Sequence, residues 1–244
     1  MLQKIVESNF VGNGPIKILY PGTVISNTDT GIGSIGRIDH AMFNGSTIIP
    51  MHPHINDEIL TYLRSGKAEH KDSEGFIEII DQTKLMLMQA GSSFFHKEKI
   101  IDEGDPLEGL QIFIRPRTEN LTPKVTFRNL VEKYSLNQWR LLASGDEDSE
   151  LHFSSDTWIY DIKIENGNRE NLPILKKENL TCFLYVFNGE IQVNDKIMLQ
   201  TKNGLVISNE KIEIFAEKDS ELVLFVTDEN APIYKGGMYS GNKI

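Results

Sequence analysis

The hydrophobic positions of this chain recur mainly at every second residue or in short runs, which is the spacing of β-strands. Clear examples are the segments 59–63 (Ile-Leu-Thr-Tyr-Leu) and 76–80 (Phe-Ile-Glu-Ile-Ile). Glycine, asparagine, aspartate or proline interrupts the pattern after every 8–12 residues or so, as in a sandwich or barrel. Only a short segment at 127–134 has a spacing that suits a helix. The pattern therefore predicts an all-β fold.

Comparison of the chain with itself indicates an internal duplication. The segment 62–72 aligns without a gap on 185–195, at an offset of 123 that is about half of the 244 residues. In both copies an apolar strand ends at a glycine-containing turn and continues as an alternating strand that ends in aspartate. We predict two related domains, 1–122 and 123–244, with the boundary in the segment 120–123.

The charge and the single cysteine exclude several classes of protein. With 25 Lys and Arg against 35 Asp and Glu, the net charge of −10 repels a phosphate backbone and argues against direct binding of nucleic acid. No stretch reaches the roughly 18 apolar residues of a membrane helix, and the first residues lack the apolar core of a secretion signal. Cys182 alone cannot form an intrachain disulfide, and its apolar neighbours favour a buried position. We expect a cytoplasmic protein without a membrane partner.

Three of the six histidines and one glutamate form two pairs of potential metal ligands. His52 and His54 are two residues apart, and so are His96 and Glu98. Residues at this spacing point to the same face of a strand, so each pair presents two donors to one side of a sheet. Two such strands facing each other across a small barrel would place three imidazoles and a carboxylate around a divalent transition metal, with about two positions open. A lone His-x-His is usually an accident of the surface, whereas two such pairs favour a metal site.

The motifs around these pairs resemble those of the pirin family, whose members are two-domain cupins. The resemblance begins with Met51-His52-Pro53-His54 and extends over nearly the whole chain. Its further motifs are Gly66-Lys67-Ala68-Glu69-His70-Lys71-Asp72-Ser73-Glu74-Gly75, Ala90-Gly91-Ser92-Ser93-Phe94-Phe95-His96-Lys97-Glu98 and Gly109-Leu110-Gln111 in the first half, and Asn137-Gln138-Trp139 with Gly189–Asn194 in the second. The resemblance implies two tandem cupin barrels, each a small jelly roll, packed face to face.

The resemblance also implies a ligand set and a metal. The family's ligand positions fall on the four residues already selected by spacing: His52, His54, His96 and Glu98. The metal implied first is Fe(II), with Mn, Co, Ni, Cu or Zn as alternatives. No second site is expected, because shifting the first histidine pair by 123 residues leads to Leu175 and Lys177.

The remaining acidic and histidine candidates receive secondary roles. Glu58 occupies a position where other cupins have a ligand carboxylate, and we expect it to orient a ligand imidazole instead. His70 belongs to a predicted hairpin and is interpreted as structural, and His40 and His152 have no partner pattern. The family usually carries Arg-Gly-Phe where this chain has Ile55-Asn56-Asp57, so the mouth of the site differs.

Two functions remain open from the sequence. The first is a non-haem dioxygenase similar to quercetin 2,3-dioxygenase, acting on a small aromatic substrate such as a flavonol or catechol, with Glu98 as the catalytic general base. The second is a metal-dependent redox-sensing or regulatory module that acts through a protein partner. The dioxygenase is the leading hypothesis, and oxygen uptake separates the two.

Overall fold

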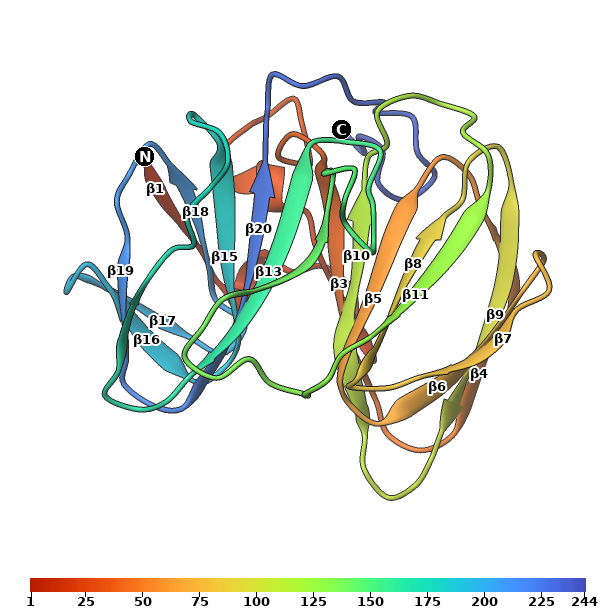
Figure 1. Ribbon diagram of the computed structural model, residues 1–244, viewed down its shortest axis with the longest axis horizontal. Coiled ribbons are helices and arrows are strands. Elements are labelled where there is room, and N and C mark those ends of the chain that lie inside the picture. Colours follow the sequence, from red (N-terminus) through yellow and green to blue (C-terminus); the bar gives the residue numbers. More distant parts are fainter.

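The computed structural model describes residues 1–244, which form two β-barrels lying side by side (Figure 1). The strands lie in four sheets of antiparallel neighbours. The only helices are two short 3-10 turns, η1 (Glu7–Asn9) and η2 (Pro21–Val24). The predicted all-β fold of two cupin barrels is confirmed.

The first barrel contains a six-stranded and a four-stranded sheet. The six-stranded sheet has the order β11-β8-β5-β10-β3-β2, formed by β2 (Ile16–Leu19), β3 (Ile35–Phe43), β5 (Glu58–Ser65), β8 (Lys84–Gln89), β10 (Leu107–Ile114) and β11 (Lys124–Asn129). The four-stranded sheet has the order β4-β9-β6-β7, formed by β4 (Thr47–His54), β6 (Lys67–Asp72), β7 (Ile77–Ile80) and β9 (Phe94–Ile101).

The second barrel repeats this arrangement. Its six-stranded sheet has the order β1-β18-β15-β20-β13-β12, formed by β1 (Leu2–Ile5), β12 (Arg140–Ser144), β13 (Thr157–Ile164), β15 (Thr181–Asn188), β18 (Gly204–Ser208) and β20 (Ser220–Thr227). Its four-stranded sheet has the order β14-β19-β16-β17, formed by β14 (Arg169–Asn171), β16 (Glu190–Val193), β17 (Ile197–Gln200) and β19 (Glu213–Ala216).

Strand β5 and strand β15 begin and end at positions that differ by the predicted offset of 123. Each is followed by one glycine with a positive φ, +67° at Gly66 and +102° at Gly189, and then by the next strand. A left-handed backbone at this point favours glycine. The duplication read from the sequence is therefore present in the structure.

The expected short helix at 127–134 is absent, and this expectation was wrong. Phe127 lies in β11 and pairs with Met86 of β8, so its backbone hydrogen bonds go to a neighbouring strand. The apolar spacing of so short a segment suits either a helix or a strand. Hydrogen bonding to the edge of β8 favours the strand.

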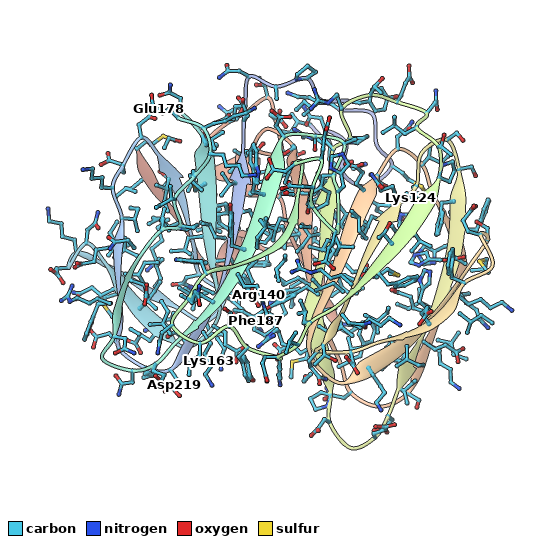
Figure 2. The ribbon with its side chains drawn as sticks, in the orientation of Figure 1. Lys124, Arg140, Lys163, Glu178, Phe187 and Asp219 are labelled. Carbon is cyan, nitrogen blue, oxygen red and sulfur yellow. The ribbon has the colours of Figure 1, made fainter.

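The two large sheets face each other and share an apolar core of 24 buried residues. Residues alternate along these strands between this core and the interior of their own barrel; in β10, Leu110 and Ile112 belong to the shared core and Phe113 to the barrel interior. Phe187, labelled in Figure 2, stacks on His40 of the other half with ring centroids 4.9 Å apart. Burial of this face holds the two barrels together.

Two hydrogen bonds cross the shared core reciprocally. The hydroxyl of Tyr62 in the first half donates to Asp161 of the second at 2.9 Å, and the hydroxyl of Tyr185 in the second half lies 2.7 Å from Nδ1 of His40 in the first. These tyrosines are equivalent in the repeat, so the interface follows the duplication.

Three segments cross between the halves. Strand β1 pairs with β18 of the second barrel, and β11, which follows the predicted boundary at 122/123, pairs with β8 of the first. After β20 the chain returns to the first barrel, as the blue segment in Figure 1 shows. We call its residues 234–244 the C-terminal strap. The division at 122/123 remains our proposal for where the two halves meet in the sequence.

Candidate metal centre

The two predicted ligand pairs lie on adjacent, hydrogen-bonded strands of one sheet. Strand β4 pairs with β9 so that His52 is directly opposite His96, and an irregularity in the register lies between Ile49 and His52. The expectation that the pairs face each other across the barrel is thus corrected, because they meet side by side. Adjacent strands lie close enough for opposite side chains to touch, so this arrangement also brings the imidazoles together.

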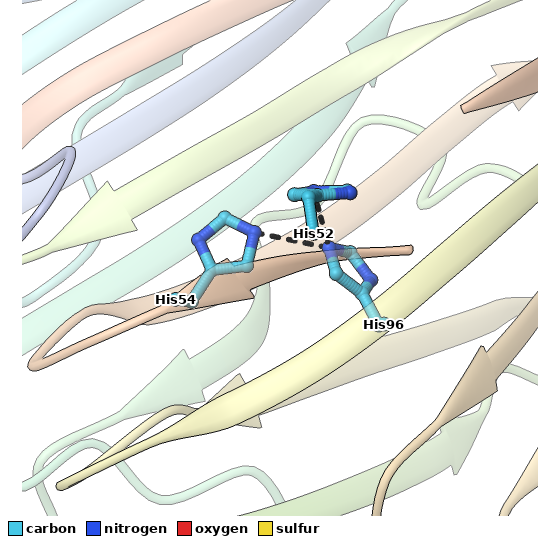
Figure 3. A group of neighbouring side chains, drawn as sticks. All are labelled: His52, His54 and His96. Carbon is cyan, nitrogen blue, oxygen red and sulfur yellow. Dashed lines mark hydrogen bonds between the residues drawn. The ribbon is translucent and has the colours of Figure 1, made fainter. Parts of the chain in front are cut away.

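The three imidazoles converge through one nitrogen each, as Figure 3 shows. Nε2 of His96 lies 2.9 Å from Nε2 of His52 and 3.0 Å from Nε2 of His54. Three nitrogens about 2.1 Å from one metal, at right angles around it, would be about 3.0 Å apart. The observed spacing and the neutral nitrogen donors fit a divalent transition metal.

The second nitrogen of His52 faces a fixed acceptor. Its Nδ1 donates to the carbonyl of Pro50 at 2.9 Å, which leaves Nε2 with a free lone pair. His54 differs, because its buried Nδ1 has no hydrogen bond, and the nearest carboxylate, that of Asp57, is 3.7 Å away. Asp57 is fully buried and was not recognised as part of the site from the sequence.

Burial favours the neutral form of the His52 and His96 imidazoles. Burial, assisted by the neighbouring His54 and His52, lowers the pKa of His96 to about 2. Burial also lowers the pKa of His52, although this ring is only partly enclosed and is the most exposed of the three. Because a metal binds the neutral ring, binding needs no proton release from His52 or His96 at neutral pH.

Glu98 points into the barrel from the strand that carries His96. Both of its carboxylate oxygens accept hydrogen bonds from Nε2 of Gln111, at 2.9 and 3.1 Å, and burial raises its pKa to about 7. With Asp39 and Gln111 it lines a cavity of about 40 Å³ that is otherwise mainly apolar. Its oxygens lie within 4.8 Å of ligand atoms of His96 and His70, and they do not form such a group with the other two histidines.

His70 lies against the histidine cluster and is more than a hairpin residue. Its Nδ1 is 3.4 Å from Nδ1 of His96, and its Nε2 is 2.7 Å from Asp72. The sequence interpretation placed it in the hairpin and missed this contact. The His-x-Asp spacing on an alternating strand was the available signal, because it places both side chains on the inner face.

Glu58, His152 and Lys97 do not take part in the histidine cluster. The Glu58 carboxylate accepts hydrogen bonds from Gln89 and from the backbone N–H of Ser154, and it forms no hydrogen bond with an imidazole. The expected role of Glu58 in orienting a ligand was therefore wrong, and it links the two halves instead. His152 binds the carbonyl of Asp146, outside the site. Lys97 alternates with the buried His96 and Glu98 and is oriented away from the interior.

The C-terminal strap covers one side of the histidine cluster. The ring of Tyr239 lies 5.0 Å from that of His54 and 5.5 Å from that of Phe113, measured between centroids. The Arg37 guanidinium, which forms two 2.6 Å hydrogen bonds with Asp39, lies 5.2 Å from the Tyr239 ring. A segment that follows the second barrel thus forms part of the wall of a site in the first.

The second barrel has no comparable site. Its interior is an apolar cluster of 18 residues, and both groups of potential metal ligands in the structure lie in the first barrel. Cys182 is buried there in β15, and burial raises the pKa of its thiol to about 12, as suits an inert core residue. No helix of the structure is long and apolar enough to cross a membrane.

The fold and the site define a two-domain cupin, or bicupin, with a histidine cluster in one barrel. The pirin family model matches residues 28–114, and a model described as the quercetinase C-terminal cupin domain matches 141–226. The chain is 30% identical to quercetin 2,3-dioxygenase of Escherichia coli K12 over 176 residues, which cover 71% of this chain and 74% of that protein. The chain belongs to the pirin family.

Two further comparisons agree with this assignment. A pirin-like protein of Caulobacter vibrioides is 28% identical over 182 residues, covering 73% of this chain and 77% of its own length. The crystal structure of YhhW from Escherichia coli superimposes with a TM-score of 0.78 at 24% identity, covering 93% of this chain and 98% of that one. The second likeness shows that the bicupin fold is shared.

Proposed function

We propose that this protein is a metal-dependent dioxygenase that acts on flavonols such as quercetin. The observation that carries the proposal is the convergence of three Nε2 atoms. Those of His52 and His54 lie 2.9 and 3.0 Å from Nε2 of His96. The E. coli relative is named for the quercetin reaction, and a second crystal structure of YhhW from E. coli is described as a complex with nickel(II). We propose His52, His54, His96 and Glu98 as the ligands and Fe(II) as the metal.

The chain's own residues would hold the metal and move one proton. A divalent metal bound there would supply Lewis acidity toward the substrate hydroxyl and a place for dioxygen to react. Glu98, with a pKa near 7, is suited to take the 3-hydroxyl proton of a flavonol at neutral pH. Gln111 holds its carboxylate through two hydrogen bonds and so orients it.

A substrate would reach the histidine cluster from the side of His52. The cavity of about 40 Å³ beside Glu98 is far smaller than the roughly 300 Å³ or more of a typical ligand pocket. His52 is the partly exposed imidazole, whereas His54 and His96 are buried. A flavonol would therefore approach past His52, and Tyr239 and Phe113 would lie behind the cluster.

The test is turnover of quercetin by the iron-loaded protein in air. We expect loss of the flavonol absorbance that depends on oxygen and releases carbon monoxide. Glu98→Gln should reduce turnover more than metal content, because an amide keeps an oxygen ligand but is a poor base. If the metal-loaded protein consumes no oxygen with flavonols or catechols, the proposal is wrong. If Glu98→Gln is fully active, the base is a different group.

A second candidate is a metal-dependent regulatory module that binds a protein partner. The observation favouring it is the outer face of the metal-bearing sheet, which exposes large apolar side chains: Ile48, Phe95, Ile77 and Ile79. The net charge of −10 would direct such a module to proteins rather than to nucleic acid. Absence of oxygen uptake together with intact metal binding would favour this candidate.

A further inference from the structure

A row of three buried side chains leads from a surface turn to the histidine cluster. Nε2 of His70 lies 2.7 Å from an oxygen of Asp72, and Nδ1 of His70 lies 3.4 Å from Nδ1 of His96. None of the three side chains is more than 5% exposed. His96 then presents its Nε2 to His52 and His54.

The proton positions along this row follow from the chemistry of its ends. Oδ1 of Asp72 accepts hydrogen bonds from the backbone N–H groups of Glu74 and Phe76, both at 3.0 Å, so the carboxylate is fixed by the turn. A carboxylate can only accept, so Nε2 of His70 carries the proton. In a neutral ring the Nδ1 of His70 is then an acceptor, and Nδ1 of His96 donates to it.

This assignment leaves Nε2 of His96 with a free lone pair directed at the cluster. The opposite tautomer of His96 would place an N–H there and could not bind a metal. His52 reaches the same state through the carbonyl of Pro50, a fixed acceptor. His96 lacks a backbone acceptor of this kind, and the imidazole of His70 takes its place.

We propose that His70 and Asp72 are positioning residues that fix the tautomer and ring orientation of His96 and so prepare it to bind a metal. The proposal rests on the metal centre of the proposed function and deepens it. It replaces the interpretation of His70 as a hairpin residue. Asp72 has both roles, because one oxygen closes the turn while the other holds His70.

Asp72→Asn is the sharpest variant because it keeps the shape of the side chain. If its amide oxygen stays on the turn, its NH₂ group meets the N–H of His70, and His70 must change tautomer and present an N–H to His96. If the amide is reversed, its NH₂ group meets the N–H groups of Glu74 and Phe76. Either arrangement places a donor against a donor. His70→Phe is the second variant, since it keeps a buried ring and removes the acceptor.

The measurements use Ni²⁺ as the probe, in competition with a chelator, together with its ligand-field absorption spectrum. We expect both variants to bind Ni²⁺ about 10–100-fold more weakly and with a shifted spectrum. Asp81→Asn is the control for the turn, because Asp81 also accepts a backbone N–H in a turn, that of Thr83, and contacts no histidine. His40→Phe is the control for a buried histidine with two polar partners. Both controls should bind Ni²⁺ as the wild type does.

Nitrogen-15 NMR of the metal-free protein gives a readout that does not depend on metal. We expect His96 to be protonated on Nδ1 in the wild type and to lose this single tautomer in Asp72→Asn. Wild-type affinity, spectrum and tautomer in both variants would overturn the proposal. If the wild type itself binds no Ni²⁺, the proposed metal centre fails, and the tautomer of His96 in the wild type and Asp72→Asn still decides the positioning role.

Discussion

The carboxylate of Asp57 accepts a hydrogen bond from the backbone N–H of Tyr239 at 3.0 Å, although 182 positions separate the two residues. The same carboxylate accepts the N–H of Ser240 at 2.8 Å and lies 3.7 Å from Nδ1 of His54. One buried acidic group therefore anchors the C-terminal strap and faces a proposed ligand. The residue that anchors the segment closing the site therefore also lies beside the site.

Shortening Tyr239 should open the wall of the site. We expect Tyr239→Ala to release bound Ni²⁺ to a chelator several-fold faster, because the ring packs on His54. Tyr234→Ala is the matched control, since Tyr234 lies on the same strap and is held through its backbone N–H to Pro116. Equal release rates for wild type and Tyr239→Ala, measured by stopped-flow absorbance, would show that the strap does not limit exchange.

Elemental analysis should find about one divalent transition metal per chain, because only the first barrel holds a group of convergent donors. The double variant His52→Ala, His54→Ala should lose this metal. His152→Ala should retain it, since His152 is bonded to a carbonyl outside the site. Two metals per chain, or metal retained in the double variant, would contradict the ligand assignment.

Stability of the metal-free protein should depend on pH through Glu98. Its pKa rises from 4.5 to about 7 in the folded protein, so its contribution to stability is complete below pH 4.5 and is lost as the pH rises through 7. The free energy of unfolding of the wild type, minus that of Glu98→Gln, should fall by roughly 3 kcal/mol from pH 4.5 to about pH 8. Urea titrations at several pH values measure this. Glu69→Gln, on the outer face of the same sheet, is the control, and a similar trend there would remove Glu98 as the cause.

The second half alone should not be a stable monomer. Residues 123–244 would expose their side of the 24-residue shared core and would lack β1, the partner of β18. We expect this fragment to bind a hydrophobic dye strongly or to aggregate. A monomeric fragment that melts cooperatively, by sedimentation and calorimetry, would show that the shared core is dispensable.

The sequence predicts the strands and the same-face placement of each pair of side chains, because both depend on local spacing. Strands β5 and β15 are buried on both faces, and such strands appear in the sequence as short, nearly continuous apolar runs, which is a property of consecutive residues. The His-x-His pair on β4 follows the same rule, because one strand places both rings on one face. For the same reason the duplication could be recognised from one hairpin.

Contacts between distant segments could not be predicted in this way. That β4 lies directly beside β9 depends on the register of two strands, and spacing within each strand does not define it. The hydrogen bonds of Asp57 to the strap and of Glu58 to Ser154 join different halves of the chain. His70 was underestimated because its ligand-facing nitrogen is defined only by the position of His96.

The strap also has a consequence for the order of events during synthesis. At roughly 5–20 residues per second, Tyr239 is added roughly 7–30 s after Glu98. During that interval the emerging first barrel holds all three clustered histidines without the tyrosine wall, and without the β20 face on which its large sheet will pack. If the proposed metal is bound, an ion offered at that stage would therefore meet a more open site than an ion offered to the finished chain.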